Sequence, residues 1–418
     1  MYTNWEVGPV LTSGRVAICG SASVRSACGR GWIARPSAPT IPLSPTAAPP
    51  PRLPAMTTLK KAPVEVKVSP SHTMRALIKH HAGPELQFVP DRAKPVPGPR
   101  DVLVRVSKVG ICGTDRHIWE WDAWAASRIP VGIVTGHEFV GVIEAVGSAV
   151  TKYQPGLRVS AEGHVTAWKD YNSRTGNAHI ASDTRIIGID RDGCFADYVV
   201  VPEENVWPVH PSIPDRIAAV LDPLGNAVHT VMAAGVSAKS VLVTGTGIIG
   251  LMAVTVAKAA GAGRIFATDV DPKRRALAKK LGAVEAFDPR QEGWIAEVRK
   301  SCRGEGADVL LEMSGAEPAL TQGFDALRNG GTAALLGLFK GPVHFDINRL
   351  VVFKGCTVLG INGRKMFETW YQMEELLLSG KLELDDIVTH EFPLEQFKKA
   401  HHTMISGEGI KVVMNVNG

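Results

Sequence analysis

The sequence predicts an α/β protein in which a β-rich domain is interrupted by a second domain built on a doubly wound parallel sheet. From Met74 onward, short runs rich in Val and Ile follow one another between Gly and Pro residues, a pattern typical of strands. After about residue 230 such runs alternate with helical stretches. That alternation is typical of a parallel sheet covered by helices on both faces.

The individual elements follow from these runs. In the β-rich part, strands are predicted at 74–80, 101–112, 141–150 and 195–202. In the second domain, strands are predicted at 240–245, 264–269, 307–315, 332–338 and 357–363, with helices within 272–283 and 317–331. The last residues need another surface to pack on. The predicted division is therefore 74–230 for the β-rich domain, 231–362 for the second domain, and 363–418 as a segment that completes the first.

The first 73 residues differ from the rest. They contain 11 of the 28 prolines and no hydrophobic period, so we expect a disordered segment. The segment is poor in acids, as organelle transit peptides are, but it lacks an Arg-lined helical face. Met56 and Met74 offer later starts, so the segment is either a genuine leader or an upstream extension of the reading frame.

Charge and composition exclude several classes of protein. The net charge is +5, but residues 1–73 carry eight Lys or Arg against two acids, which leaves the remainder close to neutral. A nucleic-acid partner is therefore not expected. No run of about 20 apolar residues predicts a membrane span. The six cysteines are scattered without paired spacing, which disfavours a disulfide framework and favours a reducing, cytoplasmic setting.

A dinucleotide site is predicted where the second domain begins. Gly245, Gly247 and Gly250 form a GxGxxG turn between a strand and a helix, and Asp269 stands 19 residues further on, at the end of the next strand. Such glycines allow a tight turn and close approach to a pyrophosphate. Asp269 would bind the adenosine ribose and repel a 2′-phosphate, which favours NAD over NADP. Arg274 tempers that preference, since an Arg near the ribose could bind the phosphate.

A metal site is predicted in the β-rich domain. Cys112 follows an apolar strand, and the adjacent pair His137 and Glu138 comes 25 residues later. Thiolate, imidazole and carboxylate together suit an open zinc site with one position left for water or a substrate oxygen. Asp222 is either a fourth ligand or the N-cap of the Ala/Val-rich helix that follows it.

Several motifs resemble the zinc-containing medium-chain alcohol dehydrogenase superfamily. They are ICGTD (111–115), GHEFVGVIEAVG (136–147), GCFADYVVVP (193–202) and the Gly-rich turn. The resemblance extends from about Met74 to the end of the chain. It implies a GroES-like catalytic domain interrupted by a Rossmann-type NAD-binding domain, and an enzyme with zinc and NAD as cofactors.

The resemblance also implies roles for individual residues. Catalytic zinc falls on Cys112, His137 and Glu138, and Thr114 and His117 match a proton-relay pair. Asp222 matches an acid that supports the relay or the metal, and His164 matches a histidine tied to substrate preference. The positions that match NAD contacts are Ile249, Asp269, Arg274, Leu336, Gly337, Leu338, Ile361 and Asn362.

One stretch departs from the superfamily, whose members mostly carry a second, structural zinc on four cysteines. Here residues 166–183 contain no cysteine, and the matching positions are Ala167, Asp170, Ser173 and Ala181. We therefore expect one zinc per chain. Because this lobe helps subunits associate in the superfamily, the expected homo-oligomer could be a tetramer or a dimer.

The expected substrate is a small amino acid. The stretches CGTDRHIWEWDAW (112–124), AEGHVT (161–166), LDPLGNAVHT (221–230), EMSG (312–315) and GRKMFETWYQM (363–373) are closest to superfamily members that oxidise the 3-hydroxyl of L-threonine. A polyol or secondary-alcohol dehydrogenase is the alternative. A non-catalytic binding protein of the same fold is a remote one, because the residues of both predicted sites are retained together.

Overall fold

The computed structural model describes residues 72–417, and the predictions about the leader lie outside this part of the chain. The strands are β1 (Thr73–Ile78), β2 (Gln87–Ala93), β3 (Asp101–Gly110), β4 (Glu138–Val146), β5 (Arg158–Ala161), β6 (His164–Val165), β7 (Arg185–Ile186), β8 (Tyr198–Pro202), β9 (Val206–Pro208), β10 (Ser240–Thr244), β11 (Arg264–Thr268), β12 (Glu285–Phe287), β13 (Ala307–Glu312), β14 (Leu327–Leu335), β15 (Thr357–Gly360), β16 (Val388–Pro393) and β17 (Lys411–Asn415).

Helices connect these strands. They are α1 (Gly113–Glu120), α2 (Ala123–Arg128), α3 (Tyr171–Arg174), α4 (Asp215–Ala218), α5 (Leu221–Ala234), α6 (Ile248–Ala259), α7 (Pro272–Leu281), α8 (Trp294–Ser301), α9 (Glu317–Ala326), α10 (Glu368–Leu378) and α11 (Phe397–Ile405), with short turns η1 (Ala178–Ile180), η2 (Glu203–Asn205), η3 (Asn348–Val352) and η4 (Leu394–Gln396). Within residues 72–417 no helix has the length and apolar character needed to span a membrane.

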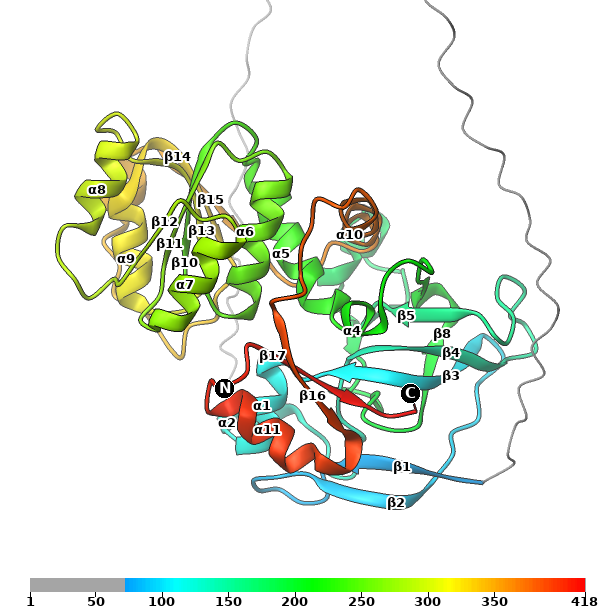
Figure 1. The fold of residues 1–418 in the computed structure, drawn as a ribbon. Helices are drawn as coiled ribbons and strands as arrows, with labels where there is room; N and C mark the ends of the chain where they lie inside the picture. Colours follow the sequence, from blue (N-terminus) through cyan, green and yellow to red (C-terminus); the bar gives the residue numbers. More distant parts are fainter. Residues whose placement is uncertain (1–71, 418) are drawn as a thin grey trace, which may run out of the picture. The chain divides into compact units, whose positions relative to one another are not determined.

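The β-rich part is organised around a seven-stranded sheet. Its strands follow the order β16-β17-β3-β4-β5-β9, and β8 also pairs with β3. β17, close to the end of the chain, pairs antiparallel with β3. Residues near the C-terminus therefore lie in the same sheet as residues of the first half of the chain (Figure 1).

The six-stranded sheet is parallel throughout and has the order β12-β11-β10-β13-β14-β15. Because side chains alternate along a strand, its two faces pack against different helices. Val241 and Val243 of β10 belong to a core with residues of α5 and α6. Leu242 between them belongs to a core with residues of α8 and α9. Figure 1 shows these helix pairs on opposite sides of the sheet, and the predicted doubly wound α/β fold is confirmed.

One predicted helix is shorter than expected. The helical stretch predicted within 317–331 ends at Ala326, and β14 begins at Leu327. The ammonium group of Lys354 accounts for the early end, because it binds the carbonyl oxygens of Phe324 and Leu327 at 2.5 and 2.6 Å. These bonds satisfy acceptors that a longer helix would have used internally.

Three glycines meet where β4 begins. Gly188 has a φ of +77°, and a Cβ atom there would lie 2.2 Å from the carbonyl oxygen of Gly136. A Cβ atom on Gly193 would lie 2.1 Å from the same oxygen. Gly136 directly precedes His137, so this backbone contact helps to fix the position of the predicted metal ligand.

Replacing Gly188 tests this packing. Gly188→Ala is expected to lower the free energy of unfolding by about 2–4 kcal/mol, because backbone strain and displacement of Gly136 add together. Gly176→Ala is the matched control, since Gly176 has a φ of +87° and a Cβ atom there would meet nothing within 4 Å; it should cost only the strain, about 1–2 kcal/mol. Equal losses of unfolding free energy in denaturant titrations of the two variants would contradict the close contact between Gly188 and Gly136.

Candidate active site

The three predicted metal ligands are brought together by the pairing of β3 with β4. Cys112 is the N-cap of α1, two residues after β3 ends. Glu138 is the first residue of β4 and pairs with Gly110, the last residue of β3. One ligand atom from each of Cys112, His137 and Glu138 can be chosen so that all lie within 4.8 Å of one another. No other such cluster of ligands occurs in residues 72–417.

These residues fit a zinc ion. In a tetrahedral zinc site the ligand atoms are about 3.3–3.8 Å apart, so only a small contraction is needed. His137 and Glu138 are 6 % and 1 % exposed. Nδ1 of His137 and Oε1 of Glu138 are buried without a hydrogen-bond partner. Buried polar atoms are seldom left without partners, and a metal ion bound at this cluster would satisfy the Glu138 oxygen.

The charges around this cluster also favour a cation. Burial lowers the pKa of His137, but the hydrogen bond and the charge of Cys112, with the carboxylates of Asp115 and Asp222, raise it to about 10. Burial is the largest influence on Glu138 and raises its pKa. Glu138 faces Lys411, whose Nζ is 2.5 Å from Oε2, and both Lys411 and His137 act to lower its pKa. Asp115 and Asp222 therefore place negative charge around the ligands, which favours the binding of a cation.

Thr114 and His117 both lie on α1. The Thr114 hydroxyl is 3.8 Å from Sγ of Cys112, so it borders the metal cluster. The His117 side chain is 53 % exposed, and its Nδ1 is 2.5 Å from Oδ2 of Asp122. One predicted relay residue thus lies beside the cluster and the other at the solvent.

Asp115, which the sequence analysis did not single out, accepts a 2.8 Å hydrogen bond from the Cys112 amide.

A buried ion cluster centred on Arg364 lies beside the metal ligands. Its Nη2 is 2.6 Å from Oε1 of Glu162, and its Nη1 is 2.6 Å from Oδ2 of Asp222. Arg364 and Glu162 are 2 % and 0 % exposed. Burial would raise the pKa of Glu162, but Arg364 and His164 hold it well below its usual value.

His164, predicted from the resemblance, belongs to this cluster. Its Nδ1 is 2.7 Å from Oε1 of Glu162, and 3.2 Å from Nη2 of Arg364. Trp370 donates a 2.7 Å hydrogen bond to the other oxygen of Glu162. Sequence reasoning missed Glu162, Arg364 and Trp370, although all three lie within stretches that carry the resemblance.

The N-cap interpretation of Asp222 is wrong. α5 is capped by Val220, without a side-chain bond, and Asp222 lies inside the first turn. Its carboxylate binds Arg364 instead of the helix terminus, because the guanidinium supplies charge-assisted hydrogen bonds. The metal-ligand cluster found in the described residues does not include Asp222.

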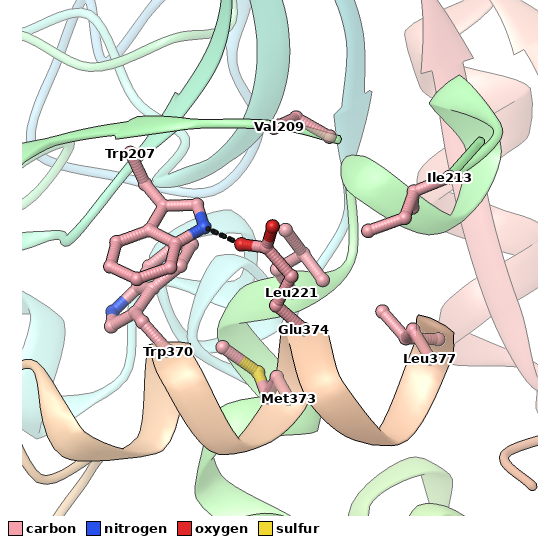
Figure 2. Close-up of a pocket in the computed structure, with 8 residues that line it drawn as sticks. All are labelled: Trp207, Val209, Ile213, Leu221, Trp370, Met373, Glu374 and Leu377. Atoms are coloured by element: carbon pink, nitrogen blue, oxygen red, sulfur yellow. Dashed lines mark hydrogen bonds between the residues drawn. The ribbon is translucent and has the colours of Figure 1, made fainter. Parts of the chain in front are cut away.

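A small hollow lies behind the Arg364 cluster. Figure 2 shows it between β9 and α10, with the Trp207 indole donating a 3.0 Å hydrogen bond to Glu374. Its lining residues are Trp207, Val209, Ile213, Leu221, Trp370, Met373, Glu374 and Leu377. Trp370 is shared with the ion cluster, and none of the metal ligands lines the hollow. The hollow therefore lies next to the ion cluster and is separate from the metal ligands.

The Gly-rich turn has the geometry that a pyrophosphate requires. Gly245 has a φ of +83°, and a Cβ atom there would lie 2.6 Å from Cβ of Ser314. A Cβ atom on Gly250 would lie 1.9 Å from the Gly245 carbonyl oxygen. Around Gly247, the N-cap of α6, nothing lies within 4 Å. Two glycines thus close the turn, and the third leaves room at a helix N-terminus, where phosphate groups bind.

Asp269 and Arg274 border this turn. Oδ2 of Asp269 accepts a 2.8 Å hydrogen bond from the amide of Thr246, which holds the carboxylate next to the Gly-rich turn. Nη1 of Arg274 is 4.0 Å from the same oxygen. Asp269 and Arg274 therefore lie close together beside the Gly-rich turn.

Of the other predicted cofactor residues, Ile249 lies in the first turn of α6, and the rest lie at the carboxyl ends of β14 and β15. The amides of Leu336 and Gly337 donate to the carbonyl oxygen of Glu312, and the amide of Ile361 donates to that of Leu335. Leu338 is 91 % exposed, and Asn362 is exposed. Ligands of open α/β sheets bind outside the carboxyl ends of the strands, so these residues have a suitable position.

Two carboxylates organise the lobe in which the superfamily usually holds a second zinc. Asp170 accepts hydrogen bonds from the amides of Ser173 and Ser182 at 2.8 and 2.9 Å. Asp183 accepts from the Thr166 hydroxyl and the Ala167 amide at 2.5 and 3.0 Å. The ends of the lobe are therefore held by hydrogen bonds from backbone amides and the Thr166 hydroxyl to these two carboxylates.

Comparison with known proteins agrees with this geometry. The alcohol dehydrogenase GroES-like domain family matches residues 98–212, and the zinc-binding dehydrogenase family matches residues 249–379. An L-threonine 3-dehydrogenase from Rhizobium rhizogenes is 46 % identical over 348 residues, covering 82 % of this chain and 99 % of the relative. One from Pyrococcus abyssi is 46 % identical over 320 residues, covering 76 % of this chain and 92 % of the relative.

Solved structures show the same fold. An alcohol dehydrogenase from Thermus sp. ATN1 has a TM-score of 0.75 at 29 % identity, covering 82 % of this chain and 100 % of that one. A zinc-binding dehydrogenase from Sinorhizobium meliloti, solved with NADP, has a TM-score of 0.74 at 27 % identity, covering 82 % and 99 %. The chain therefore belongs to the zinc-binding dehydrogenases and, within them, to the L-threonine 3-dehydrogenase family. The GroES-like and Rossmann-type domains implied by the resemblance are confirmed.

Removing Arg364 should destabilise the protein strongly. Arg364→Met leaves Glu162 and Asp222 buried without their cation, and we expect a loss of about 3–5 kcal/mol in the free energy of unfolding. Arg128→Met is the control, because its bidentate pair with Asp190 lies at the surface; it should cost about 1 kcal/mol or less. Similar losses in urea titrations would show that the buried cluster is not structural.

The acid sensitivity of the lobe follows from Asp170. Hydrogen bonds from Ser173 and Ser182 lower its pKa to about 2 from 3.8. A depressed pKa stabilises the folded lobe above pH 3.8, and this contribution disappears as the pH falls through 2. Asp170→Asn should be cleaved several-fold faster by pepsin within 166–183 at pH 4, with the difference from the unmodified protein vanishing near pH 2. Arg174→Gln, at an exposed position in the same lobe, should be cleaved like the unmodified protein at both pH values.

Proposed function

We propose that this protein oxidises the 3-hydroxyl of L-threonine to 2-amino-3-oxobutanoate, with NAD as acceptor and one zinc ion held by Cys112, His137 and Glu138. The observation that carries the proposal is the cluster of thiol, imidazole and carboxylate whose ligand atoms lie within 4.8 Å of one another, with Oε1 of Glu138 buried and without a partner. The substrate is supported by relatives that bear the name L-threonine 3-dehydrogenase along nearly their whole length.

The cofactors supply the difficult chemistry. When bound, zinc polarises the hydroxyl oxygen so that its proton leaves more readily, and NAD accepts the hydride. The protein supplies the proton path. The Thr114 hydroxyl, which borders Cys112, takes the proton, and His117 passes it to solvent from its exposed position beside Asp122. Asp222 adds negative charge near His137 and is itself held by Arg364.

His164 supports an amino-acid substrate. With its Nδ1–H donated to the Glu162 carboxylate, the ring is fixed in the tautomer that leaves Nε2 as an acceptor. An acceptor of this kind suits the ammonium group of an amino acid, which donates three hydrogen bonds. A neutral diol lacks that group and would gain less from this site.

NAD is proposed over NADP because of Asp269. Its carboxylate borders the turn and would repel a 2′-phosphate. The remaining contacts proposed for NAD are Gly245, Gly247, Ile249, Gly250, Arg274, Leu336, Gly337, Leu338, Ile361 and Asn362. The proposed domain limits are 74–230 for the catalytic domain, 231–362 for the NAD-binding domain and 363–418 for the segment that completes the catalytic domain.

A homo-oligomer, either a dimer or a tetramer, is part of the proposal. β15 is the last strand of the six-stranded sheet within the described residues, and apolar side chains near it are exposed, with Val352 at 60 % and Phe353 at 81 %. An exposed strand edge with apolar neighbours is suited to pairing with a second copy. A cytoplasmic location is proposed from the four free thiols of residues 72–417, which include the ligand Cys112.

A substrate panel with zinc-loaded protein tests the function. NADH should form with L-threonine, with NADP giving a much lower rate. Cys112→Ala should lose zinc and at least about a hundredfold in kcat, since the Lewis acid contributes several kcal/mol. Cys302→Ala is the control, because this buried thiol is in a core of the other sheet; it should keep its zinc and activity. NADH formation with 2,3-butanediol or a polyol but not with L-threonine would overturn the substrate.

A further inference from the structure

Glu312 is a buried acid that the proposed reaction does not use. It is the last residue of β13 and is fully buried. In the sheet it pairs with Thr244 of β10 on one side and with Leu335 of β14 on the other. The chain order reverses between β10 and β13, so Glu312 stands at the topological switch point, where α/β sheets bind dinucleotides.

The Glu312 carboxylate holds the loop that follows β13. Oε1 accepts hydrogen bonds from the amides of Ser314 and Gly315 at 2.9 and 3.1 Å, and also from the Ser314 hydroxyl. Oε2 lies 3.3 Å from the Gly315 amide. Burial raises the pKa of Glu312, and these donors oppose that effect.

The backbone of Glu312 holds a second loop. Its carbonyl oxygen accepts from the amides of Leu336 and Gly337 at 3.0 and 3.1 Å. The two loops then touch through glycines. A Cβ atom on Gly315 would lie 2.3 Å from the Leu338 carbonyl oxygen, and one on Gly337 would lie 2.4 Å from Oε2 of Glu312. Glu312 therefore fixes residues 313–316 and 336–338 against each other.

The first of these loops also touches the Gly-rich turn, because a Cβ atom on Gly245 would meet Ser314. Asp269, the proposed ribose partner, is on the other side of this turn, after β11. A dinucleotide crosses the switch point with its pyrophosphate at the turn. Its adenosine half then lies towards β11, and its nicotinamide half towards the loops after β13 and β14.

We propose that Glu312 is a positioning residue for the nicotinamide half of the dinucleotide, acting through the loops 313–316 and 336–338. The inference rests on the proposed NAD-linked function. A neutral amide in place of the carboxylate keeps one acceptor oxygen without its charge and presents two hydrogens in place of the other oxygen, so the bonds from the loop amides weaken. The loops would separate, and contacts to nicotinamide would weaken while contacts to adenosine stayed intact.

Calorimetric titration of the zinc-loaded full chain with NAD and with ADP-ribose, which lacks nicotinamide, separates the two halves. Glu312→Gln should raise the Kd of NAD about tenfold and change that of ADP-ribose less than about twofold. Ser314→Ala removes one donor and leaves the carboxylate in place. It should raise the Kd of NAD about threefold with the same selectivity, and it decides the matter if Glu312→Gln does not fold.

Asp308→Asn is the matched control at the opposite end of β13. The Asp308 carboxylate also accepts bonds from a neighbouring strand, from the Ser240 amide and hydroxyl at 2.8 and 2.7 Å. Its substitution should leave both dissociation constants within about twofold, the change expected far from the ligand. Equal weakening of NAD and ADP-ribose in the Glu312 and Ser314 variants, or no weakening of either, would overturn the inference. Failure of the unmodified protein to bind NAD would instead overturn the proposed function.

Discussion

The guanidinium of Arg364 allows two carboxylates to stay in the protein interior. Glu162 and Asp222 are 0 % and 9 % exposed, and each binds a different part of this one cation. Isolated buried charges cost several kcal/mol each, and only close pairing with good hydrogen bonds offsets that cost. The pKa of Glu162 is lowered and the pKa of Arg364 is raised although both side chains are buried. Both directions agree with strong pairing of the two charges.

This ion cluster joins the parts of the chain that must cooperate in the reaction. Glu162 follows β5 in the GroES-like domain, and Asp222 lies in the first turn of α5. Arg364 is two residues after Asn362, which is proposed to contact NAD, and Asp222 in turn acts on His137 through its charge. The sites proposed for substrate, metal and cofactor therefore share a few side chains. In the NAD-binding domain Glu312 has a comparable place, because it holds one loop through its carboxylate and a second loop, distant in sequence, through its backbone carbonyl oxygen.

Local patterns explain which features the sequence could predict. The sequence could predict features that depend on residues near one another in the chain. These are the strand and helix on either side of the Gly-rich turn, Asp269 after β11, and the three metal-ligand residue types at Cys112, His137 and Glu138. The buried pairs of Arg364 with Glu162 and of Lys411 with Glu138 join residues hundreds of positions apart, and no periodicity reports such pairs. The N-cap assignment of Asp222 failed for the same reason. The start of a helix predicts that a nearby side chain accepts hydrogen bonds from the first backbone amides. In the folded protein the Asp222 carboxylate instead binds Arg364, which is distant in the sequence.

Cys112, His137 and Glu138 are proposed to hold the single catalytic zinc ion of this enzyme. Anomalous diffraction from crystals of the zinc-loaded protein, recorded at the zinc absorption edge, locates the ion. We expect one peak per chain, at about 2.0–2.3 Å from Sγ of Cys112, a ring nitrogen of His137 and a carboxylate oxygen of Glu138. A peak within the lobe at 166–183, or no peak between these three residues, would contradict this proposal.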